Sequence, residues 1–498
     1  MFGAYCVISL VRLLRFDPAS YDLGIYVEYV KQLSQLHAPV VDILAPGFNL
    51  LGNHFQIAVA VLAPFFRVFP SPATLLVGQA ALTAVSVFPV AAASSAVTGR
   101  ATGRLIAFAF GFSWGLQQLV NFDFHEIALA VPLLAFSLSA LVRRRPLATI
   151  GWAMPLVFVE ESQGFTVAAI GLLLGVTASR QPADSGRYPA GRYPAGRWND
   201  GRWKDGRRVA LWGGQFLMAW GLFGSALAIT WIIPHFSPSH TYYFWKDGGA
   251  LGGSHSFSVG ALIQQTAAHW PVKLQTTALL LLPTAFVALG SPVALVALPS
   301  LALRFMSTNS NYWGTSWHYN ATVMPILFIA AVDAAGRLRG WPAAGRRSLP
   351  ATRRWAAWRA AGAGLRAACR VGGGRIGEIM AAIAVVIAFH FPLSELWHGS
   401  TFQPDAHAAA AEAALAKVPD GVTVQATLDM LAPLAARTDT FWIGTPGNPV
   451  TQYVVFDGAN SGYSPAVTDV PAFISIIYPK ERYVQIFERD EVYVFRLG

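Results

Sequence analysis

The chain has 498 residues, of which 54% are hydrophobic and only 12% are charged. Apolar runs recur along most of its length, which excludes a soluble globular protein and indicates a polytopic membrane protein. The net charge of +10 would suggest nucleic acid as a partner of a soluble protein, but here the basic residues gather in a few loops between apolar runs. That pattern sets membrane orientation, so we expect membrane lipids and no nucleic acid as partners. The two cysteines, Cys6 and Cys369, give no support for a disulfide framework.

Residues 1–14 form a short apolar segment that contains Arg12 and has no small-residue cleavage site. We interpret this segment as a truncated or misannotated first transmembrane helix and not as a removed signal peptide. The loop that follows, residues 15–72, is long and polar for a membrane protein, and it carries four carboxylates: Asp17, Asp22, Glu28 and Asp42.

The stretch SYDLGIYVEYVKQL within this loop predicts a helix that lies on the membrane surface. Ser20 or Asp22 can cap its first amides, and apolar residues recur at helical spacing along one face. The predicted helix presents Asp22 at its start, which makes this aspartate the leading candidate for chemistry. Residues 54–69 predict a second juxtamembrane helix, because Pro64 and Arg67 interrupt that apolar run.

The remaining apolar runs predict transmembrane helices and, with the opening segment, bring the total to about eleven. An all-α membrane domain is therefore expected over residues 1–395. The predicted spans are 73–97, 104–120, 126–142, 147–160, 164–179, 209–234, 272–289, 293–306, 321–335 and 377–395.

Most of the 36 lysine and arginine residues fall in four loops, 98–104, 143–145, 180–208 and 336–376. By the positive-inside rule these loops belong in the cytoplasm, together with the N-terminus. Counting crossings then places the first polar loop and the C-terminal part of the chain on the outer face of the plasma membrane.

Loop 180–208 contains an internal repeat, GRYPA, GRYPA, GRWND, GRWKD and GRR. Its glycine, proline and arginine content predicts a disordered basic linker near anionic lipid headgroups, and the alternative is repeat slippage without function. Loop 336–376 either anchors topology or forms a basic amphipathic surface helix.

Residues 396–498 differ in texture from the rest of the chain. Residues 408–418 predict a helix, and TVQA, QYVVF, YVQIF and VYVFRL predict strands separated by turns. We expect a small extracytoplasmic α/β domain that covers an outer cavity or grips an acceptor, with a purely structural cap as the alternative.

Polar residues on the predicted outer side cluster in short loops that the spans would bring together. Charged groups at membrane depth are costly and tend to mark functional sites, although a solvated loop at the headgroup level is the alternative. The candidates, besides Asp22, are Asn53, His54, Asp123, His125, Glu126, Glu160, Glu161, Trp317 and His318.

Arg304 lies near the outer end of an otherwise apolar span. Its guanidinium could hold a lipid-linked phosphate through two parallel hydrogen bonds, and the alternative is that it extends to the outer headgroups. The aromatic loops 235–247 and 311–320 could stack on sugar rings or belong to the interfacial aromatic belt.

The sequence contains no P-loop, no GxGxxG after a strand, no HExxH and no Cys/His metal spacing. Nucleotide-driven transport is therefore not expected. No cofactor is expected either, and a divalent metal has no support from spacing alone.

Several segments are similar to a bacterial family of predicted multispanning membrane proteins of unknown function: YDLGIY, PGFNLLGNHF, FPSPATLLVGQA, NFDFHE and YWGTSWHY. Typical members read FDLGIFDQ, GPGFNLLGDHF and DFHE and carry a Glu-Asp pair at the end of a span. That family in turn resembles the GT-C glycosyltransferases, relatives of protein mannosyltransferases and aminoarabinose transferases. The resemblance covers most of the chain.

This resemblance implies a sugar donor carried on a polyprenyl phosphate and an acid in the first outer loop, which corresponds to Asp22. Asp22 would take the proton of the acceptor hydroxyl, and Arg304 is our choice for stabilising the departing phosphate. The remaining candidates would line the cavity and bind acceptor or sugar.

Three positions depart from the family pattern: Asn53 replaces an acid, Ser162 replaces the second acid of the pair, and Val27-Glu28 replaces Asp-Gln. These changes would alter substrate handling or metal dependence, or remove catalysis. Our leading hypothesis is a glycosyltransferase that acts on an envelope glycan, lipid or protein acceptor. The alternatives are a transporter or flippase of a lipid-linked or small solute and a catalytically inactive scaffold of envelope-glycan assembly.

Overall fold

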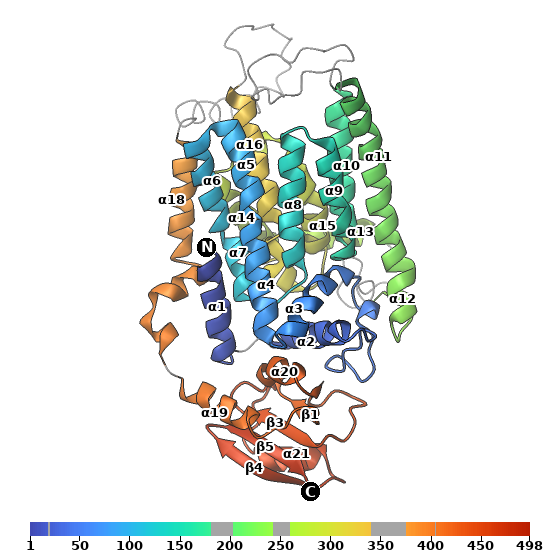
Figure 1. Cartoon of the computed structure of the whole chain (residues 1–498), viewed down its shortest axis with the longest axis vertical. Coiled ribbons are helices and arrows are strands. Elements are labelled where there is room, and N and C mark those ends of the chain that lie inside the picture. Colours follow the sequence, from blue (N-terminus) through green and yellow to red (C-terminus); the bar gives the residue numbers. More distant parts are fainter. Residues whose placement is uncertain (18–19, 181–202, 243–258, 340–374, 404) are drawn as a thin grey trace.

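A computed structural model describes residues 1–17, 20–180, 203–242, 259–339, 375–403 and 405–498. It consists of a helical bundle with a small α/β domain at one end (Figure 1). The repeat segment 181–202 and most of loop 336–376 lie outside the described residues, so the interpretations of both loops stay predictions. The predicted linker 180–208 is shorter than expected at its C-terminal end, because a helix begins at Trp203 and includes residues 203–208.

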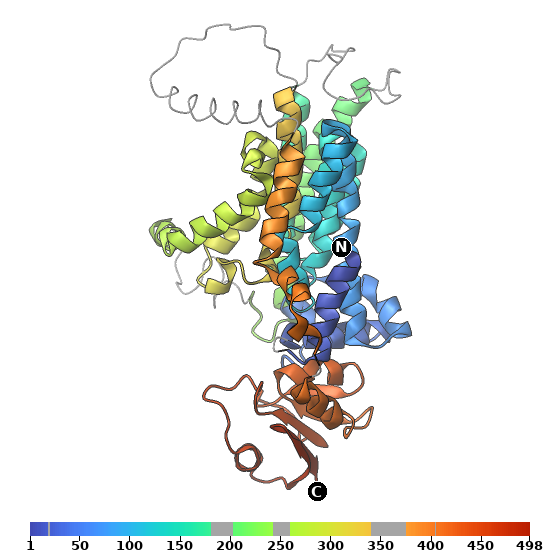
Figure 2. The ribbon, with the colours of Figure 1, turned by 90° about the vertical axis from the view of Figure 1, so that its left-hand side faces the viewer.

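The bundle is built from helices whose sequences are apolar on most faces. In chain order these are α4 (Pro72–Val85), α5 (Val87–Thr98), α6 (Arg100–Gly111), α7 (Trp114–Asn121), α8 (Ile127–Val142), α9 (Pro146–Ala153), α10 (Gln163–Ser179), α11 (Trp203–Leu227), α12 (Ile233–Phe236), α13 (Val259–Ala267), α14 (Trp270–Leu281), α15 (Leu298–Phe305), α16 (Val323–Arg339) and α18 (Ile376–Ala388). Helices α13 and α14 project from one side of the bundle (Figure 2).

Burial distinguishes the centre of the bundle from its edge. The apolar window of the segment His318–Arg337, which contains α16, is 94% buried inside the protein, whereas that of Gly206–Phe236, which contains most of α11, is only 33% buried. Large apolar side chains such as Trp212 and Phe223 therefore face outward from α11, as does Trp231 in the π-helical segment Ala228–Ile232 that follows it. An apolar surface of this kind suits contact with lipid.

The prediction of eleven spans is not confirmed. Among the described residues, three helical segments are long and apolar enough to cross a membrane, and the third of these is Pro72–Thr98. Shorter apolar helices of 10–17 residues occupy several of the other predicted spans. The predicted span 272–289 is not one straight helix, because α14 ends at Leu281 and Ala285 and Phe286 both adopt positive φ.

The first loop forms a separate layer at the end of the bundle. Helix α1 (Phe2–Leu14) packs on α4 and α7, and the Tyr5 hydroxyl donates to the Gly111 carbonyl oxygen at 2.6 Å. Helix α2 (Ser20–Ser34) and the short α3 (Ala63–Val68) lie between the bundle and the C-terminal domain (Figure 1). The predicted short helices of the first loop are therefore present, although residues 54–62 form a turn and a 3₁₀ segment and only 63–68 are α-helical.

The C-terminal domain contains a five-stranded sheet in the order β2-β1-β3-β5-β4. Strand β1 (Thr423–Ala426) runs parallel to β2 (Asp439–Trp442) and β3 (Tyr453–Asp457), whereas β5 (Val492–Leu497) runs antiparallel to β3 and β4 (Tyr483–Arg489). The helices are α19 (Ala406–Leu415), α20 (Leu428–Ala435) and α21 (Val470–Ile477). All four predicted strands are present, and the sequence prediction missed β2.

Helix α20 packs directly on α2. A Cβ atom at Gly24 would lie 3.0 Å from Leu431 Cβ, so glycine permits the close approach of the two helices. At the same contact, Lys31 Nζ donates to the Thr438 carbonyl oxygen at 2.7 Å, and the ring centroids of Tyr21 and Trp442 lie 5.0 Å apart. The C-terminal domain is therefore held by the helix that carries Asp22.

Helices α10 and α11 also cross at glycines. A Cβ atom at Gly171 would lie 2.6 Å from the Gly214 carbonyl oxygen and 2.8 Å from the Met218 amide nitrogen. Both obstacles are backbone atoms, which cannot rotate out of the way. The crossing therefore requires a residue without a side chain at Gly171, as close helix pairs in membranes commonly do.

We expect Gly171→Ala to lower the free energy of unfolding by about 1–3 kcal/mol, because overpacking forces the two backbones apart. Gly175→Ala on the same helix is the matched control, since a Cβ atom there would meet no atom within 4 Å. The measurement is the thermal unfolding midpoint of each full-length variant in detergent. Equal midpoints for the two variants would contradict the proposed tight crossing.

Candidate active site

Polar side chains from segments far apart in the sequence converge between the end of the bundle and α2. They come from the first turn of α2, the turn before the 3₁₀ segment Ile57–Leu62, the loop between α7 and α8, the turn before α10 and the loop between α15 and α16. Their convergence depends on the fold alone, because no two of these segments are neighbours in the chain.

Asp22 lies in the first turn of α2, where the exposed amides of a helix N-terminus favour a carboxylate. Burial raises the pKa of the Asp22 carboxyl, the charges of His125 and His54 oppose this shift, and the charge of Glu126 adds to it. These influences indicate that Asp22 lies within electrostatic reach of three of the other predicted residues. A carboxylate with a raised pKa is a better proton acceptor near neutral pH than an ordinary aspartate.

Tyr26 lies one helical turn after Asp22 and connects α2 to the bundle. Its hydroxyl lies 2.9 Å from Gln56 Oε1 and also hydrogen-bonds to the Glu126 carboxylate. Sequence reasoning missed this role, because the helical spacing identifies Tyr26 only as a residue of the apolar face of the helix. Its buried hydroxyl needs a partner, which is the one signal that could have revealed it.

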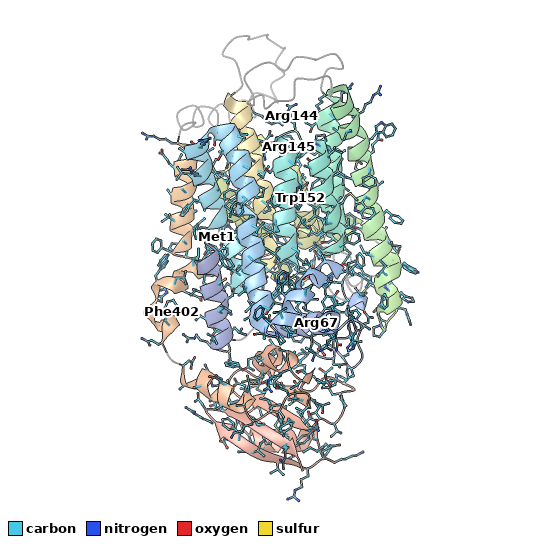
Figure 3. All side chains as sticks on the ribbon, viewed as in Figure 1. Met1, Arg67, Arg144, Arg145, Trp152 and Phe402 are labelled. Carbon is cyan, nitrogen blue, oxygen red and sulfur yellow. The ribbon has the colours of Figure 1, made fainter. Side chains whose placement is uncertain are left out.

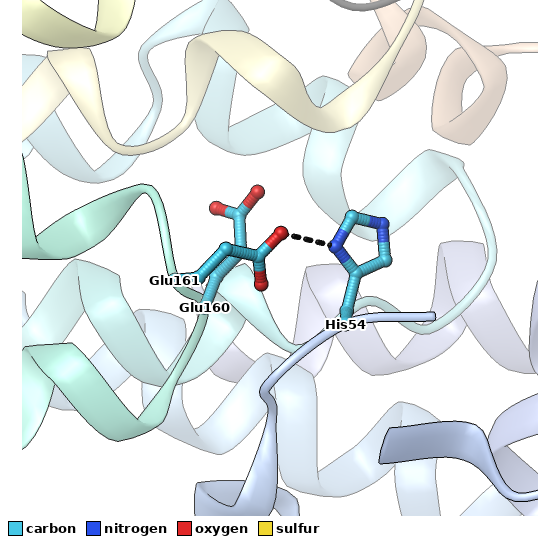
Figure 4. A group of neighbouring side chains, drawn as sticks. All are labelled: His54, Glu160 and Glu161. Atoms are coloured by element: carbon cyan, nitrogen blue, oxygen red, sulfur yellow. Dashed lines mark hydrogen bonds and ion pairs between the residues drawn. The ribbon is translucent and has the colours of Figure 1, made fainter. Parts of the chain in front are cut away.

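His54, Glu160 and Glu161 form a compact group (Figure 4). His54 Nδ1 lies 2.8 Å from Glu161 Oε1, and the other oxygen of Glu161 accepts the Phe55 amide at 3.0 Å. Tyr242, which the sequence prediction did not single out, donates to Glu161 Oε1 at 2.8 Å. Burial alone would lower the pKa of His54, but the charge and hydrogen bond of Glu161 outweigh it and raise this pKa to about 9.

This group also has the composition of a metal-ligand set. One ligand atom from each of the three side chains lies within 4.8 Å of the other two, and one imidazole with two carboxylates suits a divalent cation. No spacing motif could reveal the set, since His54 and Glu161 are 107 residues apart. The ion pair with His54 nevertheless satisfies the charge of Glu161 without a metal, and Ser162 donates to Glu160 at 2.8 Å.

A second group contains His125, Glu126 and His318. His125 Nδ1 lies 2.6 Å from Glu126 Oε2, and the rings of His125 and His318 stack with centroids 3.7 Å apart. The ring centroid of Phe122 lies 4.7 Å from that of His318 and 5.2 Å from that of Trp317. Both ring nitrogens of buried His318 have no hydrogen-bond partner among the described residues, so they are available to a ligand.

Arg304 is buried, with 7% of its surface exposed. Its guanidinium donates to the carbonyl oxygens of Tyr312 and Tyr319 at 3.0 and 3.2 Å and to Asn320 Oδ1 at 3.0 Å. It therefore holds the loop that carries Trp317 and His318, and it does not extend to the protein surface as the alternative interpretation required. Its phosphate-binding role stays a prediction.

Asp123 and Asn53 lie at the edges of the site. Asp123 Oδ2 lies 3.5 Å from the Leu23 amide nitrogen, and half-buried Asn53 directly precedes His54 at the end of a 3₁₀ turn. The loop around Asp123 is fixed by Gln79, whose side chain donates to the Asp123 carbonyl oxygen at 2.8 Å and accepts the His125 amide at 3.1 Å. Gln79 was missed, although a lone amide within the apolar run 73–97 is a usable signal.

Residues 12–457 match the family described as "Predicted membrane protein (DUF2079)". The chain belongs to this family. It is accordingly a membrane protein, as its composition predicted. No curated protein matches the sequence.

This DUF2079 protein is similar in fold to solved structures of ArnT from Cupriavidus metallidurans. The structure of ArnT bound to undecaprenyl phosphate covers 99% of this chain and 97% of its own, with 13% sequence identity and a TM-score of 0.54. The apo structure of ArnT covers 99% and 96%, with 14% identity and a TM-score of 0.50. The DUF2079 chain therefore has a GT-C glycosyltransferase-like fold.

The raised pKa of His54 predicts a pH-dependent stability. The His54–Glu161 pair contributes fully below the unfolded-state pKa of about 6.5, and the contribution is lost as pH rises through the folded-state pKa. We expect it to be on the order of 1–3 kcal/mol. The unfolding midpoint of the wild-type protein should therefore fall between pH 7 and about pH 10 more steeply than that of His54→Asn.

Exposed His37 offers the matched control for this measurement. His37→Asn should keep the wild-type pH slope, since His37 contacts only Gln32 at 3.3 Å. If His54→Asn and wild type showed parallel pH profiles, the buried ion pair would not be the cause of the slope.

Proposed function

We propose that this DUF2079 protein is an integral-membrane glycosyltransferase that moves a sugar from a polyprenyl-phosphate donor to a cell-envelope acceptor on the outer face of the plasma membrane. The observation that carries the proposal is that Asp22 lies in the first turn of α2, within electrostatic reach of His54, His125 and Glu126, in a fold similar to that of ArnT. The ArnT structure was determined with undecaprenyl phosphate bound, which supports a lipid of the same class as the donor carrier here.

In the proposed reaction, Asp22 accepts the proton of the acceptor hydroxyl as that oxygen attacks the anomeric carbon of the sugar. The bond between the anomeric carbon and the phosphate oxygen breaks in the same step, and the electron pair leaves with the polyprenyl phosphate. A base on one side and positive charge on the other are what such a displacement requires. The site supplies the base through α2, and the proposed source of the positive charge is an arginine, because the charge of His54 is paired with Glu161.

Arg304 is proposed to contribute to the same charge. Three of the five N–H groups of a guanidinium are used by the loop contacts described above, which leaves two for a phosphate oxygen. Tyr319 lies within electrostatic reach of Asp22, and its ring centroid lies 5.8 Å from the Arg304 guanidinium. The base and the proposed phosphate ligand would thus both lie near Tyr319.

The distribution of arginines supports the outer location of the site. Figure 3 places Arg144 and Arg145 at the end of the bundle opposite the C-terminal domain. Under the positive-inside rule that end lies in the cytoplasm, so the site and the C-terminal domain lie outside. Arg67, at the other end, is used structurally, since it donates to the Ser34 carbonyl oxygen at 2.6 Å.

A coupled transporter is the alternative from another class, and such proteins carry charged groups inside the membrane bundle, as this chain does at Asp333. Asp333 in α16 accepts from Ser291 Oγ and from Arg337 Nε, both at 2.6 Å. Both partners are fixed within or next to α16, and the pair lies toward the end of the helix that we assign to the cytoplasm. An arrangement that is already fully paired suits a structural role better than ion movement.

The test of the proposed function is Asp22→Asn, with Asp42→Asn as the matched control in the same loop. We expect Asp22→Asn to lower sugar transfer by at least about 100-fold, because an amide cannot accept the proton. Asp42→Asn should leave transfer unchanged, since an amide oxygen can still accept the Gly47 amide that Asp42 holds at 2.7 Å. The measurement is the release of undecaprenyl phosphate from a panel of undecaprenyl phosphate sugars.

Binding of undecaprenyl phosphate to each variant, measured separately, distinguishes a lost base from a lost fold. Asp22→Asn should bind the lipid as wild type does. Full transfer activity in that variant would remove Asp22 from the role of base. Binding without transfer in the wild-type protein would favour the transporter or flippase, and absence of both would favour the scaffold.

A further inference from the structure

A second group of ionisable side chains lies inside the C-terminal domain, away from the candidate active site. It joins three elements: His407 lies at the start of α19, Asp429 in the first turn of α20, and Asp457 at the end of β3. One ligand atom from each residue lies within 4.8 Å of the other two. The two aspartates are buried, with exposed fractions of 2% and 0%.

The orientation of His407 is fixed by a contact outside the group. Its Nδ1 lies 3.1 Å from the Asp490 carbonyl oxygen, which can only accept, so Nδ1 carries the hydrogen. Nε2 lies 2.6 Å from Asp457 Oδ2, a hydrogen-bonding distance, so the proton between these two atoms is the one that a metal ion would replace. A histidine that ligates a metal is commonly oriented in this way by a carbonyl or carboxylate behind it.

The two carboxylates are oriented toward the same point. Asp457 Oδ1 accepts the amides of Ala459 and Asn460 at 2.8 and 3.1 Å, which leaves Oδ2 facing the group. Asp429 Oδ1 lies 3.2 Å from the Thr427 hydroxyl oxygen, whereas buried Asp429 Oδ2 has no hydrogen-bond partner among the described residues. A buried carboxylate oxygen without a donor is costly, and a cation would satisfy it.

We propose that His407, Asp429 and Asp457 form a divalent-metal site, with Zn²⁺ as the ion that fits best. An imidazole nitrogen and two carboxylate oxygens are accepted ligands of Zn²⁺, and water completes a tetrahedral shell. The imidazole ligand disfavours Ca²⁺ and Mg²⁺, which prefer oxygen. A dication with a neutral imidazole also balances the charge of both carboxylates, so that no uncompensated charge stays buried.

The site would act through α20. This helix carries Asp429 near its start and Leu431, which contacts α2 across Gly24. An ion that ties α20 to α19 and β3 therefore fixes the surface on which α2 rests. The proposal stands independently of sugar transfer, because each of its ligands belongs to the C-terminal domain.

The experiment uses the full-length protein in detergent, stripped with EDTA, loaded with Zn²⁺, desalted and examined by elemental analysis. His407→Ala and Asp429→Asn should each bind one Zn²⁺ fewer per chain than wild type. The difference in zinc content between wild type and each variant reports the C-terminal site, whichever ion the His54 group holds. Glu412→Gln is the matched control, since Glu412 is an exposed carboxylate on the same helix as His407.

The thermal midpoint provides the second readout. Added Zn²⁺ should raise the midpoint of wild type and Glu412→Gln more than that of His407→Ala, since an ion that binds only the folded state stabilises it. Asp429→Asn keeps the shape of the side chain and can donate to Asp457, so it should fold without metal. Equal zinc content in wild type and both site variants would overturn the proposal and would leave a proton shared between the two carboxylates.

Discussion

The need to pair buried charge is the constraint on which the arrangement at the end of the bundle depends. Glu126 and Glu161 are each 1% exposed, and an isolated carboxylate in such surroundings is strongly unfavourable. Each is paired with a histidine, Glu126 with its neighbour His125 and Glu161 with His54. The second pair joins the first loop to the turn before α10, so that the loop has one position on the bundle.

The same requirement extends from the bundle to the C-terminal domain. The Glu126 carboxylate holds the Tyr26 hydroxyl, which fixes α2 one turn after Asp22. On its opposite side α2 receives α20 at Gly24. Asp22 is therefore placed by contacts from two directions, and a small movement of the C-terminal domain would be transmitted to it through a single helix. Through this geometry the C-terminal domain, although distant in sequence, contacts the helix that carries the candidate base.

Much of this organisation could be predicted from the sequence, because apolar runs report burial and clustered acids report a site. The surface helix that carries Asp22 and four of the five strands were predicted on those grounds. The broken helices after Leu281, the role of Gln79 and the partner of Tyr26 could not be predicted. Each of these features depends on which distant segment packs against the residue concerned. Hydrophobic periodicity gives no information on the pairing of distant segments. The number of spans is unconfirmed for a related reason, since short apolar helices do not reveal whether they cross a membrane.

Two of the three departures from the family pattern, at Asn53 and Ser162, bear on the charge of the site. Members that the sequence resembles carry an acid where this chain has Asn53 and another where it has Ser162. With both acids present, the group around His54 would hold more negative charge than one imidazolium can offset, and a dication would be the natural complement. Here Ser162 instead donates to Glu160, and His54 offsets Glu161. Glu160 and Glu161 together still exceed the single positive charge of His54, but each departure removes one further negative charge that the family pattern would carry at that position.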